Sequence, residues 1–120
     1  MLASFLGCIT VMIGAFGAHA LKDVLLLNNK LDAFETGVKY QMIHVVVLMV
    51  IGIGWSKLAS RWVYVASVLL VSGITLFSGS LYLLAITNYS KIGIVTPIGG
   101  VMLIFGWIAI FMSARYSHQN

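Results

Sequence analysis

The stretch Trp62–Ile86 reads WVYVASVLLVSGITLFSGSLYLLAI and contains no charged side chain. A helix of this length would extend about 37 Å at 1.5 Å per residue, and a bilayer crossing needs roughly 20 apolar residues over about 30 Å. The stretch therefore predicts a transmembrane helix. Three further apolar stretches lie on either side of it: Leu2–Leu21, Val38–Trp55 and Gly93–Ala114.

The composition of the whole chain also indicates a membrane protein. Of its 120 residues, 61% are hydrophobic and only 8% are charged. Soluble domains average about 25% charged residues, so this chain lacks the polar groups that a globule in water would need on its surface. Because the four apolar stretches use most of the sequence, residues 1–120 are expected to form a single integral membrane domain.

The connectors between these stretches predict the topology. Two of them, Ser56–Arg61 and Thr87–Ile92, are short, so neighbouring helices are expected to run antiparallel. The connector after the first stretch is longer and holds all three acidic residues; its Asn28-Asn29 pair signals a turn, and helical periodicity resumes at Leu31. The sequence therefore predicts an all-α fold, a four-helix transmembrane bundle in up-down-up-down order with an interfacial helical connector between helices 1 and 2.

Two of the predicted helices have recognisable starts. The second, from Leu31 to Trp55, would extend about 37 Å, so its first turns are expected in the headgroup layer, with Gly37 at a bend where it enters the membrane. In the fourth, Thr96 precedes Pro97 and is expected to cap the helix.

Hydrogen-bonding side chains gather at one set of helix ends. Alternating helix direction would bring these ends to the same face of the membrane, where His44 is expected below the headgroups beside Gln41 and Tyr40 on one helix surface. Polar groups at this depth are costly unless they are paired, and they usually face the bundle interior. The candidate polar cluster or binding site comprises His19, Tyr40, Gln41, His44, Ser78, Ser80, Tyr82 and Thr96.

Three interpretations of this cluster remain open. In the first, the protein is structural or accessory, and the polar groups hydrogen-bond one another across helices and hold one end of the bundle together. In the second, the cluster binds a lipid or another small amphiphile. In the third, the chain is a minimal transporter or channel. No metal is predicted, since two histidines, His19 and His44, do not supply the four ligands of a closed zinc site and no cysteine lies nearby.

Several other classes are excluded on chemical grounds. The chain is not expected to be an enzyme, because no serine lies in a nucleophile elbow and no paired carboxylates occur within the spans. No cofactor is predicted either, since the glycine-rich segment Gly14–Ala18 lacks the strand and helix of a phosphate loop. Nucleic-acid binding is not expected, because no basic run is present. The net charge of +4 favours membrane lipids as partners.

Small residues and tryptophans give two further expectations. Small residues such as Gly7, Gly14, Gly99 and Gly106 allow close helix packing in lipid, within the bundle or in a homo-oligomer. Trp107 lies deep in the fourth span, where it should pack or find an acceptor for its indole N–H.

Five segments in this order carry a family resemblance: GAFGAH (14–19), TGVKYQMIH (36–44), LFSGSLY (76–82), TPIGG (96–100) and GW (106–107). With them the chain resembles, over essentially its whole length, the YgdD/YwdK-like family of small four-helix membrane proteins, domain of unknown function 423. The resemblance implies a multi-pass protein of the bacterial plasma (inner) membrane and no particular activity. Relatives tend to be more basic in the second loop and the C-terminal tail, which implies that both termini are cytoplasmic; here the corresponding cations are Lys57, Arg61 and Arg115.

Overall fold

The computed structural model of the protein describes residues 1–58 and 60–117. Every regular element in this part of the chain is a helix, which confirms the prediction of an all-α fold. In chain order the elements are α1 (Leu2–Ala18), α2 (Lys22–Leu27), α3 (Leu31–Ile53), the 3-10 helix η1 (Trp55–Lys57), α4 (Ser60–Thr87), the 3-10 helix η2 (Ser90–Ile94) and α5 (Val95–Ser117). Residue 59, in the predicted connector Ser56–Arg61, lies outside the described residues.

Three helical stretches are long and apolar enough to cross a membrane: Leu31–Ile53, Arg61–Thr87 and Ser90–Ser117. Helix α1 is shorter, and its 17 residues extend about 26 Å. It ends at Ala18, three residues before the end of the predicted stretch Leu2–Leu21, because His19 leaves the helical conformation at φ −121° and ψ −74°. The chain then turns into α2.

The connector between α1 and α3 contains the short helix α2 and a tight turn. Asn29 adopts a φ of 52°, in the left-handed region that asparagine enters more readily than most residues. Helix α3 then begins at Leu31, where the sequence places it. The side-chain amide of Asn28 donates hydrogen bonds to the backbone carbonyls of Ala85 at 2.9 Å and Ile86 at 3.0 Å. The connector is therefore attached to the last turn of α4.

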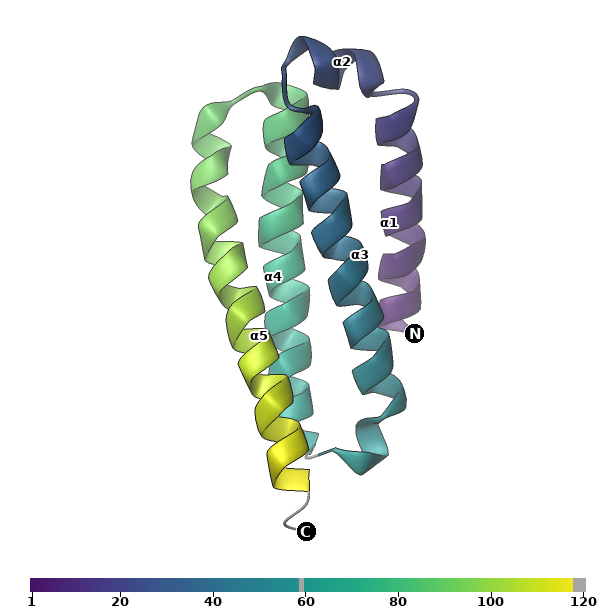
Figure 1. The fold of residues 1–120 in the computed structure, drawn as a ribbon, viewed down its shortest axis with the longest axis vertical. Coiled ribbons are helices and arrows are strands. Elements are labelled where there is room, and N and C mark those ends of the chain that lie inside the picture. The colour runs from purple at the N-terminus through teal and green to yellow at the C-terminus, as the bar shows by residue number, and fades with distance from the viewer. Residues whose placement is uncertain (59, 118–120) are drawn as a thin grey trace.

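Figure 1 shows the four long helices side by side, with α2 across one end. Helix α1 packs on α3, α3 packs on α4, and α4 makes the most extensive contact of all with α5. In the view of Figure 1, α1 and α5 form opposite edges of the molecule. The helices thus form an open row, in which each mainly contacts the long helix that precedes or follows it in the chain.

Glycines explain the close contact between α4 and α5. A Cβ atom at Gly106 would lie 2.6 Å from Cδ2 of Leu70, and one at Gly99 would overlap the backbone of Phe77. A larger residue at either position would separate the two helices, so these glycines serve packing within the chain, as lipid-embedded helices require.

Candidate functional site

The buried residues of α3 include Gly37, Gln41 and His44, which contact α4 and α5. Residues at spacings of three and four lie on the same face of a helix, which places these three in line. The Ser78 hydroxyl donates a hydrogen bond of 2.7 Å to the backbone carbonyl of Gly37. The Tyr82 hydroxyl donates one of 2.7 Å to Oε1 of Gln41. Two side chains of α4 therefore bind α3 at adjacent turns.

Gly37 allows the second of these bonds to form. A Cβ atom on Gly37 would lie only 2.7 Å from Cε1 of Tyr82, because the tyrosine ring crosses directly over the glycine. The structure thus gives Gly37 a packing role inside α3, which is helical from Leu31 to Ile53.

His44 joins α3 to α5. It is 4% exposed, and its Nε2 lies 3.1 Å from the indole Nε1 of Trp107. An indole N–H can only donate, so Nε2 accepts and the imidazole is neutral at that atom. The ring proton is therefore on Nδ1, which donates to the backbone carbonyl of Tyr40 at 2.7 Å. Trp107 finds the acceptor that its depth in the span led us to expect.

A third contact joins α4 to α5. The hydroxyls of Ser80 and Thr96 lie 2.7 Å apart, and the Ser80 hydroxyl also donates to the backbone carbonyl of Phe77 at 2.9 Å. Thr96 is the second residue of α5, which begins at Val95. It therefore binds the neighbouring helix, and the cap expected of Thr96 is not what the structure shows.

Two of the predicted cluster residues behave differently from the rest. His19 follows α1 with an exposed side chain, and α1 packs on α3 at the edge of the row, away from the α4–α5 contact. Tyr40 takes part through its backbone carbonyl, while its ring packs on Phe77 with a centroid distance of 4.6 Å. The structure brings together Gln41 with Tyr82 and Ser80 with Thr96, but it does not bring His19 to His44.

We call α3, α4 and α5 the hydrogen-bonded unit, because each pair of these helices is joined by a side-chain hydrogen bond. Ser78 and Tyr82 join α4 to α3, Trp107 joins α5 to α3, and the Ser80 and Thr96 hydroxyls join α4 to α5. Helix α1 contacts α3 differently, through glycines: Gly7 and Gly14 face valine side chains of α3, and Gly17 faces the Phe34 ring.

A groove of about 420 Å³ lies beside the hydrogen-bonded pair His44 and Trp107, and we call it the α3–α5 groove. Its size falls within the range of small-molecule sites in proteins. Its lining is mostly apolar and aromatic and comprises Tyr40, Ile43, His44, Phe77, Gly100, Leu103, Ile104 and Trp107.

Apolar helices of membrane-spanning length and hydrogen bonds between them define the class of this protein: a small all-helical membrane protein. Residues 13–100 match the family described as "Protein of unknown function (DUF423)", and the chain belongs to this family, which confirms the resemblance seen in its motifs.

Its relatives carry membrane-protein names. The chain is 42% identical over 107 residues to the UPF0382 membrane protein YwdK of Bacillus subtilis, covering 88% of this chain and 86% of the relative. It is 37% identical over 112 residues to the UPF0382 inner membrane protein YgdD of Escherichia coli K12, covering 93% and 85%. It is 43% identical over 102 residues to a UPF0382 membrane protein of Staphylococcus epidermidis, covering 83% and 80%. No solved structure matches the chain.

Proposed function

We propose that this protein is a structural or accessory component of the plasma membrane, with four helices that cross it in up-down-up-down order and both termini in the cytoplasm. One observation carries the structural role: polar side chains at membrane depth are bound to one another across all three pairs of helices in the hydrogen-bonded unit. Interhelical hydrogen bonds in membranes contribute about 0.6 kcal/mol on average and up to roughly 1.7 kcal/mol. Together they favour one helix arrangement over others, and the proposed role is not enzymatic.

The family resemblance, and not the count of cations, supports the proposed orientation, because relatives tend to be more basic in the second loop and the C-terminal tail. All three acidic residues and four of the lysines lie at the end of the molecule that carries α2, whereas the opposite end carries Lys57, Arg61 and Arg115. Aromatic residues accompany these cations, and the Trp62 and Tyr116 rings stack with centroids 6.3 Å apart. Aromatic belts mark both membrane boundaries, and three cations against four do not set an orientation. The proposed orientation therefore rests on the relatives.

A double-mutant cycle on Trp107 and His44 tests the structural role. We expect Trp107→Phe and His44→Leu each to lower the free energy of unfolding in mixed detergent micelles, and the two losses to be coupled by roughly 0.6–1.7 kcal/mol. The matched control pairs His44→Leu with Trp62→Phe at the opposite end of the molecule, where the losses should add. Additive losses in the first cycle would show that the hydrogen bond stabilises nothing, and the proposal would fail.

A second candidate function is binding of a small amphiphile, and the α3–α5 groove favours it. Its aromatic and aliphatic side chains would pack against the apolar part of an amphiphile, while His44 and Trp107 stay hydrogen-bonded to each other. A Cβ at Gly100 would lie 3.7 Å from the Phe77 ring, so Gly100→Leu should fill the groove. Native mass spectrometry of protein purified in mild detergent should then show an adduct on the wild type that Gly100→Leu loses. The same adduct on both proteins would exclude this groove.

A further inference from the structure

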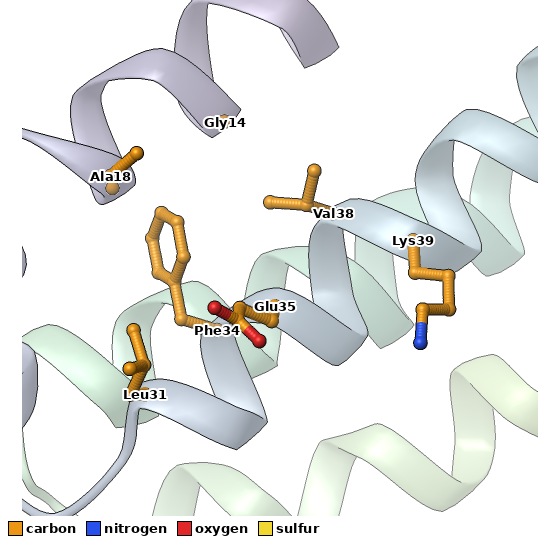
Figure 2. Close-up of a pocket in the computed structure, with 8 residues that line it drawn as sticks. Gly14, Ala18, Leu31, Phe34, Glu35, Val38 and Lys39 are labelled. Atoms are coloured by element: carbon orange, nitrogen blue, oxygen red, sulfur yellow. The ribbon is translucent and has the colours of Figure 1, made fainter.

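A second groove lies between α1 and α3, and no side chain that lines it makes a hydrogen bond between α3, α4 and α5; we call it the α1–α3 groove. Its volume is about 290 Å³. Figure 2 shows the side chains of Phe34 and Val38 extending from α3 toward α1, where Gly14 leaves space. The full lining comprises Gly14, Gly17, Ala18, Leu31, Phe34, Glu35, Val38 and Lys39.

The rim of this groove carries one carboxylate and one ammonium. Glu35 and Lys39 are four residues apart on α3, so they lie on the same face with Cβ atoms about 5–6 Å apart. Both side chains are exposed, and Figure 2 shows the Lys39 ammonium pointing away from the Glu35 carboxylate. Each charge is therefore available to a ligand, and the two together are neutral.

The depth of the groove matches the boundary between headgroups and acyl chains. Glu35 lies about 6 Å and Lys39 about 12 Å along α3 from its first residue, Leu31. Helix α3 spans about 35 Å, which exceeds a hydrocarbon core of about 30 Å, so its first turn lies among headgroups in the proposed topology. The flexible Lys39 chain reaches that layer from below, as lysines do near membrane boundaries.

We propose that the α1–α3 groove binds one phosphatidylethanolamine molecule. The lipid phosphate would accept from the Lys39 ammonium, its primary ammonium would donate to the Glu35 carboxylate, and the start of an acyl chain would lie against Leu31 and Val38, which are both partly exposed. An anionic lipid such as phosphatidylglycerol would offer Lys39 the same phosphate but would bring no ammonium to the Glu35 carboxylate. A choline headgroup has no N–H to donate and is recognised by aromatic faces, whereas the one aromatic ring in the lining, Phe34, is only 2% exposed.

Native mass spectrometry tests this proposal directly. Purified protein is titrated with phosphatidylethanolamine, phosphatidylcholine and phosphatidylglycerol that carry the same acyl chains. We expect a single ethanolamine-lipid adduct with an apparent Kd roughly tenfold lower than that of the other two lipids, as one charge-assisted hydrogen bond provides. Equal binding of the three lipids, preference for phosphatidylglycerol, or no adduct would overturn the proposal.

Two variants separate the contribution of the Glu35 charge to lipid binding from that of the groove volume. Glu35→Gln should raise the Kd for phosphatidylethanolamine roughly tenfold, to that of phosphatidylcholine, and should melt at the wild-type temperature because Glu35 is exposed. Ala18→Leu should fill the groove and weaken the binding of all three lipids. The matched control Asp32→Asn alters an exposed carboxylate one turn earlier that does not line the groove, and should change nothing. An ethanolamine preference that survives Glu35→Gln would refute the assignment. Because none of these side chains makes the hydrogen bonds that join α3, α4 and α5, the result is independent of the proposed structural role.

Discussion

Trp107 on α5 and His44 on α3 lie at the same depth in the molecule. His44 is thirteen residues after Leu31, the first residue of α3, and Trp107 is twelve residues after Val95, the first residue of α5. Both helices start at the end that carries α2 (Figure 1), so the two side chains lie about 20 Å and 18 Å along them. Equal depth allows the 3.1 Å hydrogen bond between their rings.

This bond predicts the tautomer of His44. Nitrogen-15 NMR of the imidazole should show a neutral ring protonated at Nδ1, the tautomer that is less common in free histidine, because Nε2 accepts from Trp107. In Trp107→Phe the Nε2 atom loses its donor, and its resonance should move more than that of Nδ1. His19, which is exposed, serves as the internal reference. An Nε2-protonated ring in the wild type would contradict the assigned bond.

The close approach of Gly37 and Tyr82 predicts a strong effect of a single methyl group. Gly37→Ala would place Cβ 2.7 Å from the Tyr82 ring and should displace that ring from Gln41, lowering the free energy of unfolding by about 1–3 kcal/mol. Gly79→Ala is the matched control on α4, because no atom lies within 4 Å of its Cβ position, and it should be close to neutral.

A second experiment tests whether overlap with the Tyr82 ring causes the destabilisation by Gly37→Ala. In a Tyr82→Ala background the overlap is gone, so Gly37→Ala should lose most of its effect on unfolding. An equal loss in both backgrounds would mean that the glycine matters for another reason. The measurement is equilibrium unfolding in mixed detergent micelles, as for the histidine and tryptophan pair.

Helices and their boundaries could be predicted from this sequence because they depend on local signals. The start of α3 followed from the Asn28-Asn29 turn, and the long apolar stretch around Ser78 gave α4. The end of α1 was placed too late, because Ala20 and Leu21 after His19 are apolar and extend the hydrophobic stretch. What ends α1 is the backbone conformation of His19, and hydropathy carries no information about it.

The candidate cluster stays a prediction as a site, and the pairing of its residues was not predictable from local signals. Gln41 pairs with Tyr82 and Ser80 pairs with Thr96 because of how the helices are rotated about their own axes, and this rotation depends on contacts such as the one between Gly37 and Tyr82. His19 was included because its helix end lies on the same side. In an open row of helices, two helix ends on the same side of the molecule can lie too far apart for their side chains to meet. Counting residues from the helix starts would have matched Trp107 to His44.

Asn28 should stabilise the attachment of the connector to α4. Its amide donates to the carbonyls of Ala85 and Ile86, so Asn28→Ala should lower the free energy of unfolding by about 1 kcal/mol. Asn28→Asp should cost more than Asn28→Ala, because a carboxylate would face two carbonyl oxygens and could donate nothing to them. Asn29→Gly is the matched control, since glycine adopts the φ of 52° at no steric cost. An aspartate variant as stable as wild type would rule out the two hydrogen bonds.

Helix α1 should separate from the rest of the molecule more easily than α3, α4 and α5 separate from one another. It packs on α3 through glycines, and a side chain at Gly17 would overlap the ring of Phe34. Gly17→Leu should therefore increase amide hydrogen exchange in α1 in detergent while exchange in the middle of α4 stays at the wild-type rate. Gly7→Ala is the control, because its Cβ would make an ordinary contact of 3.5 Å with Val45. Increased exchange in α1 and α4 together would show that α1 is part of one cooperative unit.

The proposed crossing topology predicts which residues a membrane-impermeant reagent can reach. Leu27, in α2, is 85% exposed, and Lys57, in η1, lies at the opposite end of a molecule 55 Å long. Cys8 is the single cysteine of the sequence, so Cys8→Ser gives a background without thiols. In that background, Leu27→Cys should react with a charged maleimide in intact cells whose outer barrier has been made permeable. Lys57→Cys should react only after the plasma membrane is opened, because the proposed topology places the end with Lys57, Arg61 and Arg115 in the cytoplasm. The reverse labelling pattern would show the opposite orientation. Labelling of both cysteine variants in intact cells would exclude a membrane between the two ends of the molecule.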